Sequence, residues 1–201
     1  MLINLFLRKP IHYKDIEGYQ YGTLFGIASY SLYTIKYAND LTFINNLMFW
    51  FLSSETLFLP YYRIDSIIHH LLGVGFIYYP YIYSIPLKHI EPHALTFLKV
   101  ETSSIFLCSS YFLKQKLKTT KNKYIQYGLN ISNILLISSF FKYRIYDFMY
   151  KIFLNPDFYN DMIIKNNTTS PLYICGITGT FFLLNCYWFQ KMVNIAYKMI
   201  K

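Results

Sequence analysis

The chain has 201 residues, of which 54% are hydrophobic and 21% aromatic, while only 14% are charged. A soluble domain usually carries about 25% charged residues, so the composition favours a membrane protein over a soluble helical protein with an unusually large core. The net charge of +9 comes from lysines and arginines at the ends of apolar runs, a pattern that indicates membrane topology rather than a nucleic-acid partner.

Apolar runs long enough to cross a bilayer follow one another along the chain. A crossing helix needs about 20 mainly apolar residues, and six windows qualify, at residues 19–37, 41–61, 65–83, 92–113, 125–146 and 171–197. The connections are short except for a polar, Asn-rich loop at residues 151–170. The sequence therefore predicts an all-α fold, a polytopic membrane helix bundle with about six transmembrane helices. Residues 1–18 would form a cytosolic tail, and residues 19–201 a single transmembrane helical domain.

Charge asymmetry predicts the orientation of this bundle. The side that holds both termini carries twelve cations, namely Arg8, Lys9, Lys14, Arg63, Lys114, Lys116, Lys118, Lys121, Lys123, Lys191, Lys198 and Lys201. The opposite side carries four, namely Lys36, Lys88, Lys151 and Lys165. Because cytosolic loops are enriched in Lys and Arg, both termini are predicted to lie in the cytosol. Two overlapping sequons that start at Asn166 and Asn167 fall in the predicted lumenal loop.

The third window carries titratable side chains at a depth where charge is costly. His69 and His70 are adjacent, and Asp65 lies four residues before His69, on the same face of a helix. Ionisable groups inside a membrane are rare and usually face a bundle interior or a wet cavity. Asp65 is placed to hold the His69 imidazole in one tautomer, and both imidazoles can border one cavity. The alternative is that they only hydrogen-bond between helices and hold the bundle together.

Two further windows supply polar groups to the same interior. Glu101 lies near the middle of the fourth window, where a carboxyl group must pair, become protonated or face water. Arg144, in the fifth window, could pair with Glu101 or with an anionic head group, or else snorkel to the membrane surface or pair with Asp147. The predicted cavity or lipid-binding residues are Asp65, His69, His70, Glu101 and Arg144.

A metal site and a bound cofactor are not expected. Imidazole and carboxylate ligands for a metal would have to come from His69, His70, His89 and His93 with Asp65 or Glu101. Pro92 interrupts the last two histidines, which fall at a predicted loop. The chain also has no P-loop, dinucleotide fingerprint or nucleophile elbow.

Taken in order, several segments resemble the TLC-domain family of multi-pass membrane proteins, over roughly residues 41–197. The segments that carry the resemblance are Asp65-Ser66-Ile67-Ile68-His69-His70, Glu101-Thr102-Ser103-Ser104, the stretch from Phe140 to Ile145, and Leu184-Asn185-Cys186-Tyr187-Trp188-Phe189. The resemblance implies a helical bundle with an internal cavity, in a membrane of the endoplasmic-reticulum type. It also implies membrane lipids as the partners of the chain.

The resemblance leaves two functions open, besides a membrane scaffold without lipid chemistry. In the ceramide synthase branch, paired histidines and following acids are associated with acyl transfer from acyl-CoA to a sphingoid amine. His69 and His70 match that pair and Glu101 the first acid, while Ser104 stands where the second acid would be. This departure favours the less characterised branch, which is linked to lipid binding, lipid sensing or membrane lipid composition. If the chain were instead an N-acyltransferase, His69 and His70 would be its catalytic residues and acyl-CoA its co-substrate.

Overall fold

A computed structural model describes residues 13–37, 41–58, 64–82, 87–163 and 171–200, all within or directly beside helices. The order is α2 (Tyr13–Tyr37), α3 (Leu41–Phe58), α4 (Ile64–Ile82), α5 (Leu87–Val100), α6 (Thr102–Thr120), α7 (Lys123–Phe140), α8 (Pro156–Ile163) and α9 (Pro171–Ile200). Between α7 and α8 lie two π-helical segments, η1 (Phe141–Asp147) and η2 (Met149–Phe153). The predicted all-α class is confirmed for these residues.

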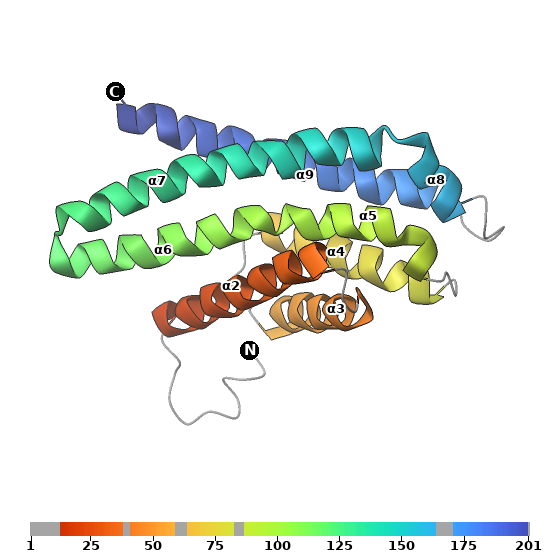
Figure 1. Cartoon of the computed structure of the whole chain (residues 1–201), viewed down its shortest axis with the longest axis horizontal. Coiled ribbons are helices and arrows are strands. Elements are labelled where there is room, and N and C mark those ends of the chain that lie inside the picture. The colour runs from red at the N-terminus through yellow and green to blue at the C-terminus, as the bar shows by residue number, and fades with distance from the viewer. Residues whose placement is uncertain (1–12, 38–40, 59–63, 83–86, 164–170, 201) are drawn as a thin grey trace.

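The long helices run side by side in an elongated bundle (Figure 1). The start of α2, the turn between α6 and α7 and the end of α9 lie at one end of the bundle, and α8 lies at the other. One helix among the described residues, at Leu172–Tyr197 within α9, has both the length and the apolar composition of a membrane span.

Two apolar clusters hold the helices together. One joins α4, α5, η2, α8 and α9 through buried side chains that include Phe76, Phe148, Phe158 and Phe181. The other joins α2, α3 and α5 through Ile27, Ile44, Met48, Phe51, Leu52 and Leu98. Many large apolar side chains also face outward, among them Trp50, Leu172 and Leu183, as expected where lipid covers the surface.

The turn between α6 and α7 follows from its sequence. Lys121 adopts a left-handed backbone with φ of 47°, and its N–H donates to the Leu117 carbonyl, which ends α6. Asn122 then caps α7, because its side chain accepts a hydrogen bond of 2.8 Å from the Tyr124 N–H. Further along, Ser110 Oγ donates to Ser132 Oγ at 2.9 Å and joins the two helices.

Several predicted boundaries were wrong. The fourth window is two helices, α5 and α6, with a break at Glu101. Pro92 lies inside α5 rather than in its first turn, so the backbones of His89 and His93 belong to a helix and not to a loop. The polar loop at residues 151–170 contains η2 and the helix α8. The sequons at Asn166 and Asn167 lie outside the described residues.

Candidate functional site

Glu101 occupies the break between α5 and α6. Its N–H donates to the Leu98 carbonyl at 3.1 Å, and its own carbonyl accepts from the Ser104 N–H at 2.9 Å, so both bonds span three residues instead of four. Such tight turns change the direction of a helix. The break leaves the Glu101 carboxylate buried in the bundle, beside the hydroxyl groups of Ser103 and Ser104.

Arg144 reaches this carboxylate from η1. Its Nε donates to Ser103 Oγ at 2.8 Å and its Nη2 to Ser104 Oγ at 3.1 Å. Nη2 also lies 3.7 Å from Glu101 Oε1, while Ser104 Oγ donates to Glu101 Oε2 at 2.7 Å. The guanidinium is therefore buried in a polar network that contains its counter-charge, which is what a buried cation requires. Asp147, the local alternative partner, is paired instead with Lys142 at 3.0 Å and Lys151 at 3.3 Å.

His69 faces α9 and lies between two of its aromatic rings. Its ring centroid is 4.8 Å from that of Phe181 and 4.9 Å from that of Trp188. The Nδ1 atom of His69 is buried and has no hydrogen-bond partner among the described residues. The imidazole is thus held by ring packing, with one nitrogen unused by the described side chains.

The other two predicted residues of α4 are placed differently. Asp65 Oδ2 accepts a 2.9 Å hydrogen bond from Trp188 Nε1 and lies 3.9 Å from Lys191 Nζ, so Asp65 joins α4 to α9. The orienting role of Asp65 toward His69 stays a prediction. His70 is buried, and its ring lies 5.8 Å from that of His69 at a tilt of 56°.

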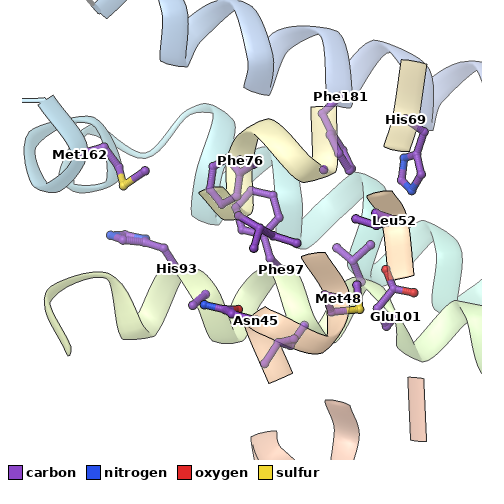
Figure 2. Close-up of a pocket in the computed structure, with 15 residues that line it drawn as sticks. Asn45, Met48, Leu52, His69, Phe76, His93, Phe97, Glu101, Met162 and Phe181 are labelled. Carbon is purple, nitrogen blue, oxygen red and sulfur yellow. The ribbon is translucent and has the colours of Figure 1, made fainter. Parts of the chain in front are cut away.

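A pocket lies between α3, α4, α5, α8 and α9. Its cavity volume is about 80 Å³, and its walls are Asn45, Met48, Leu52, His69, Gly73, Phe76, Ile77, His93, Ala94, Phe97, Leu98, Val100, Glu101, Met162 and Phe181. Figure 2 shows His69 and Glu101 at one end, His93 at the other, and Phe76 and Phe97 between them. The pocket is an apolar slot with polar ends.

Of the five predicted site residues, His69 and Glu101 line this pocket, whereas Asp65, His70 and Arg144 are not among its walls. Arg144 belongs to the site through its pairing with Glu101. At the far end, His93 Nε2 lies 3.1 Å from Asp161 Oδ2, which connects α5 to α8. This second polar end was missed, because both residues fell in stretches that were read as loops.

Further polar residues of the site had only weak signals in the sequence. Ser103 and Ser104, two and three positions after Glu101, complete its network with Arg144. Asn185 is fully buried in α9, between Phe181 and Trp188. In the sequence, the only indication of a role for Asn185 was its amide side chain within a long apolar run. No group of three or more His, Cys, Asp or Glu side chains in the described ranges could hold a metal ion, and the His89 side chain lies outside those ranges.

Comparison with known proteins agrees with this arrangement. The family model of the TLC domain matches residues 28–194. No curated protein and no solved structure matches the chain significantly. The matched region spans most of the chain and contains His69, Glu101, Arg144 and all the walls of the pocket. The chain therefore belongs to the TLC-domain family of membrane proteins, a family linked to lipid biology.

Proposed function

We propose that this protein binds a lipid by accepting one of its acyl chains into the pocket, with the polar end of the lipid beside His69 and Glu101. The observation that carries the proposal is the pocket itself, a mainly apolar slot with the half-buried His69 and the buried Glu101 at one end. Binding sites for small molecules have this character, with mainly apolar walls and a few placed polar groups.

The size of the slot fits an acyl chain. His93 and Glu101 are eight positions apart along α5 and its junction with α6, which corresponds to roughly 12 Å at the rise of an α-helix. Between them the walls are mainly apolar and come from Met48, Phe76, Phe97 and Leu98, together with the amide side chain of Asn45. Each buried methylene group of a lipid contributes about 0.8 kcal/mol, so several of them supply useful affinity.

The membrane arrangement that we propose is multi-pass, in a membrane of the endoplasmic-reticulum type, with both termini in the cytosol. Exposed lysines at 114, 116, 118, 121 and 123 surround the turn between α6 and α7. This turn lies at the same end of the bundle as the end of α9 (Figure 1). Positive charge gathered at one end of a bundle is typical of its cytosolic side.

The proposal can be tested with a photoactivatable lipid that carries a diazirine in its acyl chain. The full chain, purified in detergent, is cross-linked and the labelled residues are mapped by mass spectrometry. We expect labels on α4 and α5 at the pocket walls, such as Phe76 and Phe97. The variant Ala94→Leu fills part of the pocket and should reduce labelling at least several-fold. The matched control Ala196→Leu makes the same change on α9, away from the pocket walls, and should leave labelling unchanged.

Two results would contradict lipid binding in this pocket. Labelling that is spread over the lipid-facing surface, and is equal in both alanine variants, would leave the pocket without a ligand. If in addition His69→Ala lowered the stability of the chain but did not change labelling by the lipid, the polar residues would only hold the helices of a membrane scaffold together.

A further inference from the structure

Asn185 is a buried amide whose polar atoms the described side chains do not use. Its exposed fraction is 0%, and neither Oδ1 nor Nδ2 has a hydrogen-bond partner among the described residues. An unpaired polar group of this kind destabilises the folded chain, and more so where lipid replaces water around the bundle. A leucine of similar size would avoid this cost, so the amide calls for an explanation beyond packing.

The position of Asn185 puts this amide beside His69. Phe181 and Trp188, the two residues whose rings contact His69, lie four positions before and three positions after Asn185. Residues at these spacings share one face of a helix, so Asn185 also faces α4 at the level of His69. The Nδ1 atom of His69 is likewise buried and without a partner among the described residues. Two unsatisfied polar side chains therefore meet at one interface.

This interface adjoins the proposed lipid pocket. His69 and Phe181 are pocket walls, and Phe181 lies one helical turn from Asn185. On the other side lies Arg144, whose Cζ is 5.2 Å from the centre of the Phe140 ring, and Phe140 stacks on Phe189 of α9 at 6.3 Å. Asn185 is not itself a pocket wall, so a lipid group at this end would have to pass between His69 and Phe181 to reach its carboxamide.

The charges around this point select the kind of ligand. The guanidinium of Arg144 already lies 3.7 Å from the Glu101 carboxylate and donates to two serine hydroxyls. Its positive charge is thus matched inside the protein, and a second anion beside it would meet the negative charge of Glu101. The groups left to serve a ligand are one amide donor, one amide acceptor and one imidazole nitrogen, and all three suit an uncharged group that both donates and accepts.

We propose that Asn185 and His69 bind the hydroxyl group of an uncharged single-chain lipid whose chain occupies the pocket. This inference rests on the proposed function and adds the chemical class of the ligand. It assigns Asn185 a specificity role that excludes a carboxylate, because a carboxylate offers no donor to the amide oxygen and carries a charge that the site does not balance.

The test compares two probes of equal chain length, hexadecanol and hexadecanoic acid at neutral pH, on the full chain purified in detergent. Their dissociation constants are measured by competition with the photoactivatable lipid. The wild-type chain should bind the alcohol at least tenfold more tightly than the acid. The variant Asn185→Leu should bind the alcohol about tenfold more weakly, the loss of about one hydrogen bond to a buried group, with an unchanged or raised Tm. The control Asn194→Leu, at an exposed position of α9, should match the wild type.

A second variant gives the same information if Asn185→Leu fails to fold. His69→Phe keeps a ring between Phe181 and Trp188 but removes the imidazole nitrogens, and it should also weaken binding of the alcohol and leave weak binding of the acid unchanged. The preference of the wild-type chain for the alcohol can be measured without any variant.

The outcomes separate this inference from the proposed function. Suppose that Ala94→Leu still weakens binding. The inference alone is then overturned if Asn185→Leu binds the alcohol as tightly as the wild type does. It is also overturned if the wild type binds the acid more tightly than the alcohol. If neither probe competes for the pocket and Ala94→Leu has no effect, the proposed function fails together with it.

Discussion

Arg144 Nη2 lies 3.7 Å from Glu101 Oε1, and this pair joins two places where the described helices depart from α-helical geometry. Glu101 stands at the break between α5 and α6, and Arg144 in the π-helical segment η1. Ser104 bridges the two side chains, and Ser103 accepts a second hydrogen bond from Arg144. The irregular backbone and the buried charges thus occur together, as is common at functional sites.

The first prediction concerns the stability of this pair. Glu101→Gln leaves the Arg144 guanidinium buried without its counter-charge, and Arg144→Gln leaves the Glu101 carboxylate buried without its counter-charge. Each should lower the free energy of unfolding by about 3 kcal/mol, as expected for removing one partner of a buried pair. Because the two changes remove the same interaction, the double variant should cost clearly less than their sum. The measurement is unfolding of the purified chain in mixed micelles with increasing denaturing detergent.

The control for this prediction is Lys142→Gln, two residues from Arg144. Lys142 is half-exposed and shares Asp147 with Lys151, so its loss should cost less than about 1 kcal/mol. Strict additivity of the Glu101 and Arg144 variants would show that the two side chains act independently.

The second prediction concerns the hydrogen bond between α4 and α9. Trp188→Phe keeps an aromatic ring near His69 but removes the donor to Asp65 Oδ2. A hydrogen bond to a charged acceptor contributes about 1.5–3 kcal/mol, and the variant should lose about that much stability in the same unfolding assay. Trp50→Phe is the matched control, because Trp50 is 69% exposed, and it should change stability by no more than about 0.5 kcal/mol. Equal effects of the two substitutions would argue against a role for the hydrogen bond.

The third prediction concerns the orientation in the membrane. Single cysteines replace Lys121, in the turn between α6 and α7, and Asp157, in α8, both of which are exposed. The exposed native Cys175 is first changed to serine. In cells with only the plasma membrane permeabilised, an impermeant maleimide should label Lys121→Cys. It should reach Asp157→Cys only after the internal membranes are opened. The opposite pattern would reverse the proposed orientation, and equal labelling of both from the start would contradict the multi-pass arrangement.

The fourth prediction concerns acyl transfer. Membranes that contain the protein, supplied with acyl-CoA and a long-chain base, should form no N-acyl product. Ser104 stands where the resemblance would place a second acid, and its hydroxyl is already committed to Glu101 and Arg144. His69 alone of the histidine pair is a pocket wall. Membranes with an active acyltransferase serve as the positive control, and product formation that disappears in His69→Ala would establish an enzyme instead.

The sequence was sufficient to predict the helical class and the family, whereas the roles of His69, Glu101 and Arg144 stay predictions. Charged groups in apolar runs have few stable arrangements, so Glu101 and Arg144 could be considered as partners before the structure was known. The position of Asp65 could not be derived in this way. Its helical spacing pointed to His69, while the structure shows a hydrogen bond with Trp188, which is distant in sequence. Contacts between distant segments depend on the rotation of both helices, which periodicity does not define.

Other features left too little trace in the sequence. The helix α8 is short and contains polar residues, so it resembled a loop, although Phe158 and Met162 are fully buried in the core. The break at Glu101 was hidden in a continuous apolar window. Asn185 was noted only as part of a family resemblance, because burial without a partner is a property of the packed structure.

The π-helical segments that follow α7 have a consequence for comparing this protein with its relatives. In a π turn the backbone hydrogen bond spans five residues instead of the four of an α turn. Each π turn therefore holds one more residue than an α turn, while the helix becomes little longer. A relative in which this helix is regular would reach the same end of the bundle with a shorter stretch of sequence. Alignments with such relatives should therefore carry a gap near Arg144, and an ungapped alignment would match Phe148 and Ile152, both buried here, to residues on a different face.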